Sequence, residues 1–542
     1  VGTNAGGDTA KPNGVGVNAH VGDPDSGQNA LIGGLDPEDR NIISGNTSGG
    51  SATGGYPGTG WVIQGNYVGL AADGITAIPN STPNGAGAFS IDDCSDVLVG
   101  GTIPGATNVI SGNTSYGLAP DNSPGLTIEG NYIGTDWTGE SAIPNLVGVI
   151  ISRDQDGSVI GGTTQSARNI ISGNTISGVL TGDNGGLTIA GNYIGLNKDG
   201  TAPVSNGTGV MLGGGSIVGG TTESSRNVIS GNILYNVGIQ NALGSVSGAV
   251  VQGNYVGTNA AGTIDTAITA VQGEGVRVSA NATGNIIGGE KANRIAGNRG
   301  SGVAVRSLTI TAFSLTGSAA KNAILGNQIY GNIPGDNIPN SQGQGIDIYE
   351  ATVANASFPA DLFTDSTLNA GPTLNDPSDS DIGPNGYINF PVLNSVTQNG
   401  TEATINFGLD AADSPADQYR VEFFSNDTAD PSSYGEGQTF LGYATVSNGN
   451  NQIATLALPS GTNLSGKSIS ATTTAIDNTT DSGFGGTSEF SQIVTATTTN
   501  ASTTGLSDDL AGTGENIAPI LLVAFTSTAL AGSVLLTRKL SR

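Results

Sequence analysis

Short alternations of apolar and polar residues run along most of the chain. In "LTIAGNYIGLNKDG" (Leu187 to Gly200), Ile and Leu residues are separated by Gly, Asn and Thr, and the stretch ends on a turn-forming Asp-Gly pair. Such alternation, bounded by turn residues, is typical of short β-strands. The pattern therefore predicts an all-β protein.

The same phrase recurs. Close copies are "WVIQGNYVGLAADG" (61–74) and "LTIEGNYIGTDWTG" (126–139), and a second phrase, "NIISGN" or "NVISGN", keeps nearly the same interval. A third phrase, "IGG" or "VGG", completes a unit of about sixty residues. A fixed period of this kind predicts stacked structural units.

Within the unit, a shorter interval joins one Gly-Asn pair to the next. Asn113 and Asn131 are 18 residues apart, as are Asn174 and Asn192. We take this interval as one coil of a parallel β-helix of about 20 residues per coil, which gives about seventeen coils over residues 1–350. We expect the amides to hydrogen-bond from coil to coil in a single column. The predicted column consists of Asn46, Asn66, Asn113, Asn131, Asn174, Asn192, Asn232, Asn254, Asn298 and Asn327.

The phrases "GNYIGTDWTG", "IPNLVGVIIS" and "VIGGTTQSARNIISGN" resemble the right-handed parallel β-helix repeat proteins of bacterial surfaces. The resemblance covers about two-thirds of the chain and implies a right-handed solenoid, to which we assign residues 1–370.

A second β domain is predicted at 387–495. Alternating runs such as "TEATINFGL", "YRVEFFS" and "KSISATTTAI" are separated by turn residues at the spacing of a sandwich. The region resembles the immunoglobulin-like β-sandwich module that often closes such proteins. An Asp-rich linker is predicted at 371–386, and residues 496–509, rich in Thr and Ser, are expected to form a flexible stalk.

The C-terminal residues 510–542 carry a signal of another kind. "LAGTGE" precedes a mostly apolar stretch at 517–536, which is followed by "TRKLSR". Twenty such residues are long enough for a transmembrane helix, and the basic tail favours a cytoplasmic end. The whole resembles a sortase sorting signal of the LAxTG type, and the alternative is a plain C-terminal membrane anchor. The resemblance implies cleavage between Thr513 and Gly514, with the Thr513 carboxyl group joined to peptidoglycan. The motif residues are Leu510, Ala511, Gly512, Thr513 and Gly514.

Composition narrows the function classes. The net charge of −27 disfavours nucleic acid as a partner, and we expect membrane contact only through the C-terminal helix. The single cysteine, Cys94, rules out an intrachain disulfide, and the single histidine, His20, gives little basis for histidine catalysis. No cofactor is required by this reading.

A catalytic residue should depart from the repeat, because a group present in every coil cannot mark one site. "IDDCSD" (91–96) and "SRDQDG" (152–157) depart in this way, and they supply the candidates Arg153, Asp154 and Asp156. With the coil length above, three coils and about 14 Å would separate the two segments, too far for one carboxylate pair. Either segment could instead bind calcium or be solvated.

Calcium is also suggested by "NDPSDSDIGPNG" (375–386), where Asp376, Asp379 and Asp381 lie close together in sequence. The alternative is an Asx-rich turn. Trp61 and Trp137 could line a sugar-binding face, whereas the recurring tyrosines and Arg40, Arg168 and Arg226 favour packing along the coils.

Together these observations predict an extracellular protein of a Gram-positive-type envelope, attached to the wall by a sortase. It would be a non-enzymatic adhesin or display rod with an unidentified glycan or protein ligand. The alternative hypothesis is a surface-attached β-helix polysaccharide lyase or glycoside hydrolase, because this fold also carries such enzymes.

Overall fold

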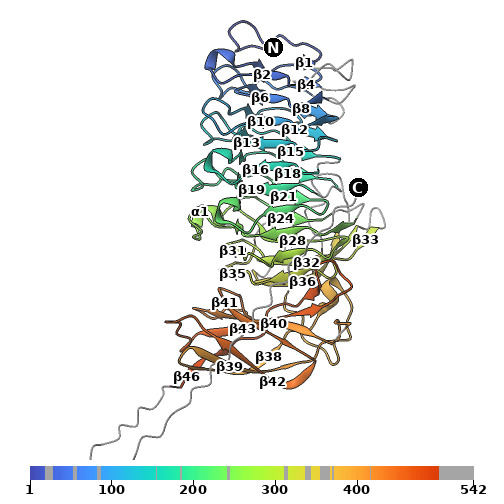
Figure 1. Ribbon diagram of the computed structural model, residues 1–542, viewed down its shortest axis with the longest axis vertical. Helices are drawn as coiled ribbons and strands as arrows, with labels where there is room; N and C mark the ends of the chain where they lie inside the picture. The colour runs from blue at the N-terminus through green and yellow to red at the C-terminus, as the bar shows by residue number, and fades with distance from the viewer. Residues whose placement is uncertain are drawn as a thin grey trace, which may run out of the picture. The chain divides into compact units, whose positions relative to one another are not determined.

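Parallel strands stacked in three sheets form the N-terminal part of the molecule (Figure 1). The computed structural model describes residues 1–18, 29–49, 51–52, 58–81, 87–153, 156–182, 186–240, 245–310, 315–335, 343–353, 367–368, 371–415 and 417–499. Neighbouring strands in each sheet come from successive coils of the chain, and nearly all pairs are parallel. This is the predicted parallel β-helix.

A complete coil contributes one parallel strand to each sheet, and two further strands pair antiparallel with strands of the first sheet. Among the described residues, the first sheet has thirteen strands and the other two have ten each. The first sheet consists of β1 (Val17–Asn18), β4 (Ser51–Ala52), β8 (Gly87–Asp92), β12 (Tyr116–Asp121), β15 (Val147–Ile151), β18 (Ser177–Thr181), β21 (Thr208–Leu212), β24 (Tyr235–Ile239), β28 (Glu274–Val278), β32 (Val303–Ile310), β33 (Leu315–Gly317), β36 (Ile346–Val353) and β37 (Thr367–Leu368). The second sheet consists of β2 (Leu31–Gly33), β6 (Val62–Gln64), β10 (Leu98–Gly100), β13 (Thr127–Glu129), β16 (Val159–Gly161), β19 (Thr188–Ala190), β22 (Ile217–Gly219), β26 (Val250–Gln252), β30 (Ile286–Gly288) and β34 (Ala323–Leu325). The third consists of β3 (Ile42–Ile43), β7 (Tyr67–Val68), β11 (Val109–Ile110), β14 (Tyr132–Ile133), β17 (Ile170–Ile171), β20 (Tyr193–Ile194), β23 (Val228–Ile229), β27 (Tyr255–Val256), β31 (Arg294–Ala296) and β35 (Gln328–Tyr330).

Minor elements lie at the corners of the coils. They are the strand pairs β5 (Gly58–Thr59) with β9 (Cys94–Ser95) and β25 (Val246–Ser247) with β29 (Ala282–Thr283), the helix α1 (Thr266–Thr269), and the 3-10 turns η1 (Pro37–Asp39), η2 (Gln165–Ala167) and η3 (Glu223–Ser225).

The interior of the solenoid is filled by columns of Val, Ile and Leu. Because side chains alternate across a strand, the same register position points inward in every coil. In the second sheet the buried column is Ile63, Val99, Ile128, Ile160, Ile189, Val218, Val251, Ile287 and Ile324. The repeated apolar letters of the sequence are therefore the core.

The predicted coil length is wrong. Thr127 pairs with Leu98 on one side and with Val159 on the other, so successive coils here take 29 and 32 residues. The interval of 18 residues from Asn113 to Asn131 covers only β12 and β13, which are two of the three sides of a coil. The sixty-residue unit thus holds two coils, and the ten strands of the second sheet replace the seventeen coils expected.

The asparagines of the predicted column fall into two columns, not one. In each column the amide Nδ2 of one Asn donates to the Oδ1 of the next, with N–O distances of 2.8–3.2 Å. The partners lie on successive coils except at Asn236, which lies four residues after its donor Asn232 and 62 residues before its acceptor Asn298. The first Asn column contains Asn13, Asn46, Asn80, Asn113, Asn145, Asn174, Asn206, Asn232, Asn236, Asn298 and Asn332. The second Asn column contains Asn41, Asn66, Asn108, Asn131, Asn169, Asn192, Asn227, Asn254, Asn293 and Asn327. The single column expected from the sequence is wrong, since its members alternate between the two.

The glycines of the repeated phrases make room for these columns. Gly161 of an "IGG" phrase has a φ of +94°, and a Cβ there would lie 1.9 Å from the carbonyl oxygen of Ala190 and 2.5 Å from Oδ1 of Asn192. Gly195, which ends a "GNYIG" phrase, faces Asn232 of the other column in the same way, at 2.4 Å. Only glycine fits at both places, which explains why both phrases recur.

Residues 392–498 form a two-sheet sandwich. One sheet consists of β38 (Val392–Asn399), β39 (Glu402–Leu409), β42 (Gly449–Ala457) and β46 (Thr497–Thr498). The other consists of β40 (Tyr419–Asn426), β41 (Thr439–Val446), β43 (Ser468–Ile476), β44 (Phe484–Thr487) and β45 (Val494–Thr495). Phe407 and Phe423 meet edge to face between the sheets, with ring centroids 5.4 Å apart. Because β46 pairs with β38, residues 497–498 belong to the sandwich and not to a stalk.

The sandwich closes the end of the solenoid. A solenoid end exposes core and unpaired backbone groups, which must be covered. Phe424 and Phe490 of the sandwich pack into the same core cluster as Ile329 and Ile346 of the last coils. Asn385, in the turn η6 (Pro384–Tyr387) of the predicted linker, is buried and accepts the backbone N–H of Asn322 at 2.9 Å. The segment 371–391 is therefore packed against the solenoid.

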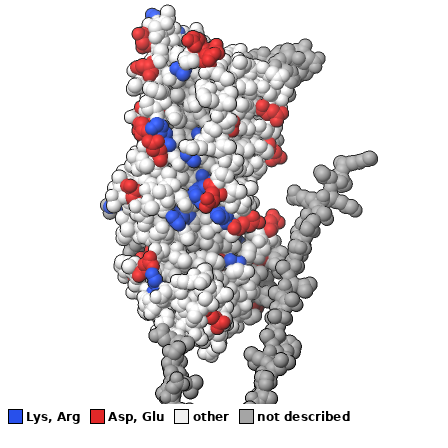
Figure 2. All heavy atoms as spheres, turned by 60° about the vertical axis from the view of Figure 1, so that its left-hand side comes forward, with Lys and Arg blue, Asp and Glu red and all other residues white. Residues whose placement is uncertain are grey.

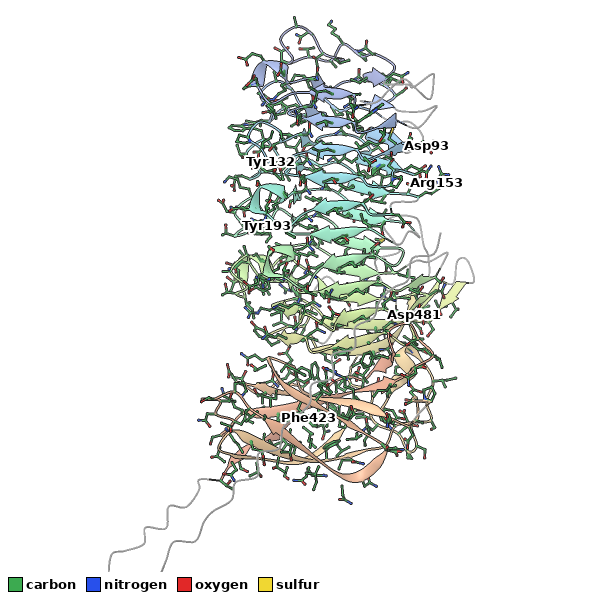
Figure 3. The ribbon with its side chains drawn as sticks, in the orientation of Figure 1. Asp93, Tyr132, Arg153, Tyr193, Phe423 and Asp481 are labelled. Carbon is green, nitrogen blue, oxygen red and sulfur yellow. The ribbon has the colours of Figure 1, made fainter. Side chains whose placement is uncertain are left out.

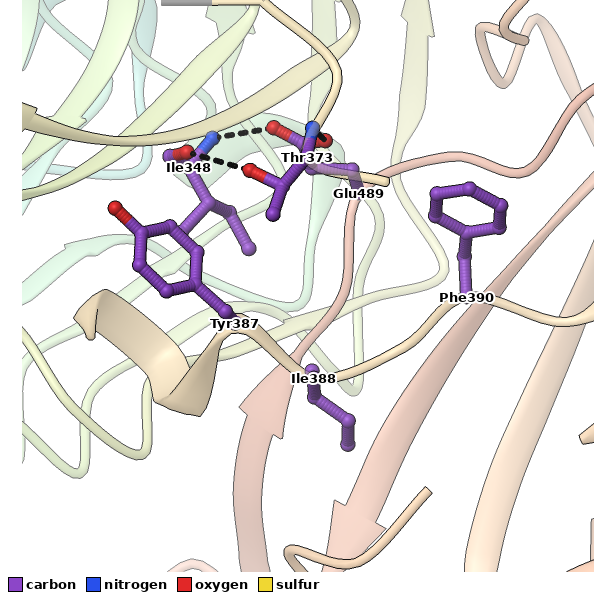
Figure 4. A pocket seen from close by; sticks show the side chains of 6 residues that line it. All are labelled: Ile348, Thr373, Tyr387, Ile388, Phe390 and Glu489. Carbon is purple, nitrogen blue, oxygen red and sulfur yellow. Dashed lines mark hydrogen bonds between the residues drawn. The ribbon is translucent and has the colours of Figure 1, made fainter. Parts of the chain in front are cut away.

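Three glutamates complete this junction. Glu422 and Glu436 accept the backbone N–H groups of Gly326 and Gly331, each at 2.7 Å. Glu489 accepts those of Ile348 and Thr373, also at 2.7 Å (Figure 4). The gap that these residues line with Tyr387, Ile388 and Phe390 has no room for a water molecule among the described atoms. Carboxylates of the sandwich thus replace the strand that a further coil would have provided.

Candidate functional sites

Two carboxylates and an arginine meet at one edge of the solenoid, where β8 and β12 end. Asp92 and Asp121 are register partners on adjacent coils, so their Cα atoms lie about 4.8 Å apart. Both alternate with inward residues and therefore point outward. Arg153, from the next coil, donates to Asp121 from Nε at 2.9 Å and from Nη2 at 2.5 Å. Figure 3 shows Arg153 and Asp93 at this edge. We call Asp92, Asp121 and Arg153 the edge site.

The two carboxylates of the edge site differ in their surroundings. Burial raises the pKa of Asp92 to about 6, and the neighbouring Asp121 and Asp93 add to the increase. Asp121 is instead paired with the guanidinium of Arg153, at 2.5 Å. Asp92 therefore holds its proton to a higher pH than an ordinary aspartate does, beside an aspartate that is paired with an arginine. Such pairs can serve as acid and base.

The predicted candidates fall around this site. The segments 91–96 and 152–157 are two coils apart, with Pro120–Pro124 between them, and not three coils as expected from the shorter coil length. The carbonyl oxygen of Asp156 accepts the N–H of Gly125, and the Asp156 side chain lies against Gly186 at a corner of the coil. Asp156 is therefore not part of the carboxylate pair. Asp154 and His20 lie outside the described residues. Asp121 could not be predicted from the sequence, because nothing in "LAPDNSPG" marks this residue until the register of the strands is known.

A second group of charged side chains lies on the outer face of the last coils. Arg277, Arg306 and Asp347 alternate with core residues on β28, β32 and β36, yet each is fully buried. Arg277 donates to Glu274 at 2.6 Å, and Tyr349 donates to the same carboxylate at 3.2 Å. In the earlier coils the matching positions are Met211 and Gly238. We call this group the buried charged cluster.

Burial raises the pKa of Asp347 in this cluster, and Glu274 adds to the increase. Burial also raises the pKa of Glu489 at the junction, where Asp347 adds to the increase. The cluster therefore continues into the junction with the sandwich. The sequence signal was the alternation in "GVRV", "AVRS" and "IDIYE", which indicates strands but does not show that their charged face is covered. The desolvation of both charges offsets much of the attraction within a buried ion pair, so such a pair adds little to stability.

The three aspartates proposed for calcium do come together. Asp376, Asp379 and Asp381 each place a carboxylate oxygen within 4.8 Å of the others. Asp379 accepts the backbone N–H groups of Asn389 and Ala412, both at 2.8 Å. Burial raises the pKa of Asp379 and Asp381, and the neighbouring carboxylates add to this. A divalent cation with oxygen ligands would relieve this repulsion.

The recurring arginines and tyrosines pack on each other. The guanidinium groups of Arg40, Arg168 and Arg226 lie 4.0–4.2 Å from the ring centroids of Tyr67, Tyr193 and Tyr255. Arg40 and Arg168 also donate from Nε to the backbone oxygens of Gly65 and Gly191. Trp61 is buried and Trp137 is half exposed, so only Trp137 can contact a ligand.

The predicted sorting signal, 510–514, and the apolar segment 517–536 lie outside the described residues. Within the described residues, no helix has the length and apolar character needed to cross a bilayer.

No protein-family model matches the chain, and no curated protein matches it. Among solved structures, the chain is similar to the A-module of the mannuronan C-5 epimerase AlgE4 from Azotobacter vinelandii. The identity is 14%, the TM-score is 0.27, and the match covers 58% of this chain and 82% of that module. A likeness this weak says nothing about function, and the parallel β-helix rests on the strand pairing itself.

Proposed function

We propose that the protein is an extracellular, wall-anchored surface protein whose β-helix displays a binding surface for a host, another cell or a glycan. The observation that carries this proposal is the closed junction, where sandwich carboxylates and Phe490 cover the last coil. The chain continues from this closed end toward the sorting motif. A solenoid that is closed at this end is therefore suited to hold its coils away from an anchor. The Asn columns stiffen it.

Cell fractionation tests the anchoring. Thr513→Ala removes the residue whose carboxyl group a sortase would transfer, and Thr504→Ala, in the Thr-rich segment before the motif, is the matched control. We expect the first variant to leave the covalently bound wall fraction and the control to remain in it. Unchanged covalent attachment of Thr513→Ala would remove the sortase proposal.

The edge site favours a second candidate, a glycoside hydrolase. Retaining glycosidases hold two carboxyl groups about 5–5.5 Å apart, close to the spacing of adjacent coils. In this scheme Asp92 would protonate the leaving oxygen, and Asp121 would attack the anomeric carbon. Water would then release the sugar, with Asp92 acting as base. Asp92→Asn and Asp121→Asn should each abolish release of reducing ends, while Asp96→Asn, at the same corner, should not. Absence of released sugar from the unaltered chain over a broad glycan panel would eliminate this candidate.

Calcium is proposed at Asp376, Asp379 and Asp381, where it would tie the segment after the solenoid to the sandwich. No cofactor is needed for display. Isothermal titration with calcium would show binding that is lost in Asp376→Asn, and an absence of heat in the unaltered chain would count against the site.

A further inference from the structure

A column of turns runs along one edge of the solenoid. Each turn follows a strand of the third sheet and is linked to the turn two coils earlier by a single backbone hydrogen bond. The four bonds join Ala72 N to Gly7 O, Trp137 N to Gly74 O, Lys198 N to Gly139 O, and Ala260 N to Gly200 O, at 2.9–3.2 Å. Tyr132 and Tyr193, labelled in Figure 3, mark this edge, which lies opposite the edge site. We call these turns the turn column.

The turns share a backbone but differ at one position. Within each turn an Asn or Asp side chain accepts backbone N–H groups, as Asp136 does from Thr138 and Glu140, both at 3.1 Å. The residue that donates to the previous turn varies, and only Trp137 is aromatic there. The variable residues are Ala72, Trp137, Lys198 and Ala260. A large apolar side chain at this one outward position is a departure from the repeat.

The indole of Trp137 is held in place although it is 50% exposed. A Cβ on Gly74 would lie 2.9 Å from its Cδ1, and also 2.9 Å from Tyr67, so the ring packs directly on the glycine of the preceding turn. The backbone bond to Gly74 fixes the base of the side chain. Little conformational entropy remains to be lost when a ligand stacks on the outer face of the ring.

Polar groups lie in the same turn as Trp137 and in the next turn of the column. Glu140, three residues on, accepts Nδ2 of Asn197 at 2.9 Å and Nζ of Lys198 at 2.6 Å. Lys198 also pairs with Asp199 at 3.3 Å. These groups offer both donors and acceptors, and Figure 2 shows charged residues of both signs in small groups on this side of the molecule. An aromatic face with flanking hydrogen-bonding groups suits the apolar face and the hydroxyls of a pyranose ring.

We propose that Trp137, with Glu140 and Lys198, is a stacking site for a neutral polysaccharide. Neutral chains are favoured because the protein carries a net charge of −27, which repels polyanions. The inference rests on the proposed display function and names the class of ligand that the solenoid would hold.

Fluorescence provides the test, because the chain has only two tryptophans. Trp61 is 2% exposed, so acrylamide should quench Trp137 selectively in the full chain. The probes are cellohexaose, chitohexaose and mannohexaose, with an alginate hexamer as the anionic comparison. At least one neutral hexamer should bind and protect Trp137 from acrylamide, and the alginate hexamer should not.

The variants distinguish stacking on Trp137 from nonspecific binding. Trp137→Ala should weaken binding about tenfold or more. Ile75→Ala is the matched control, because Ile75 is another exposed apolar residue of the turn column, and it should leave binding unchanged. Ala72→Trp places a second ring at the equivalent exposed position about 10 Å away, two coils along, and should tighten binding of a hexamer.

The proposal is overturned if no neutral hexamer binds, if only the alginate hexamer binds, or if Trp137→Ala binds as tightly as the unaltered chain. These outcomes are independent of the wall-fractionation result with Thr513→Ala, so glycan binding and anchoring can fail separately.

Discussion

Truncation of one asparagine in the middle of the second Asn column is expected to cost far more than the same change at its start. The Nδ2 of Asn192 donates to Oδ1 of Asn227 at 3.0 Å and to the carbonyl oxygens of Ile160 and Ala190 at 2.9 and 3.1 Å. Its Oδ1 accepts from Nδ2 and the backbone N–H of Asn169, at 2.9 and 3.2 Å. Asn192→Ala removes all five bonds at a fully buried site.

The size of the effect follows from what is left behind. Each neutral hydrogen bond contributes about 1 kcal/mol net, but a buried partner left unsatisfied costs about 1–3 kcal/mol. Asn169 loses the acceptor for its backbone N–H and one acceptor for its amide. We therefore expect Asn192→Ala to lower the free energy of unfolding by about 3–5 kcal/mol. Asn41→Ala, at the half-buried first position, should cost only about 1 kcal/mol.

Guanidinium unfolding of the two variants measures the difference, and amide hydrogen exchange around Asn169 shows whether coils open locally, as repeat proteins can. Equal losses in the two variants, within about 0.5 kcal/mol, would show that the columns do not act as continuous hydrogen-bonded chains.

Three further predictions concern the glycines, the junction and the edge site. Gly161→Ala should destabilise the protein by at least about 2 kcal/mol more than Gly157→Ala. Both glycines have a positive φ, but of the two only Gly161 has atoms within 4 Å of the position that a Cβ would take. Thermal unfolding of the two variants measures the difference. Burial raises the pKa of Glu436 from 4.5 to about 7, so the contribution of this group to stability is complete below about pH 4.5 and is lost as the pH rises through about 7. Glu436→Gln should therefore flatten this part of the curve of unfolding free energy against pH. An unchanged curve would contradict the assignment. Arg153→Ala should raise the pKa of Asp92 further, because the positive charge of Arg153 lowers it. A carbon-detected NMR titration measures this pKa, and a fall in the variant would contradict the prediction.

The sequence by itself predicts much of the architecture. The Val and Ile positions, the recurring Gly-Asn pairs and the IGG phrases predict a parallel solenoid, because every coil must present the same inward side chains and the same corners. The alternating runs after residue 390 likewise predict the sandwich strands, and the structure places strands there. Local pattern sufficed where the structure itself is a local repeat.

Only the tertiary structure shows which of the repeated residues lie above one another on successive coils. The sequence repeats Gly-Asn on two corners of each coil, and only the strand register shows that Asn113 and Asn131 belong to different columns. The same register brings Asp121 beside Asp92, and the packing of the last coils brings Tyr349 to the carboxylate of Glu274; these contacts join residues about 30 or more positions apart, which no local pattern encodes. Coil length is set by loops of unequal size, and these loops leave no periodic signal, so the side-chain neighbours across coils could be known only from the folded chain.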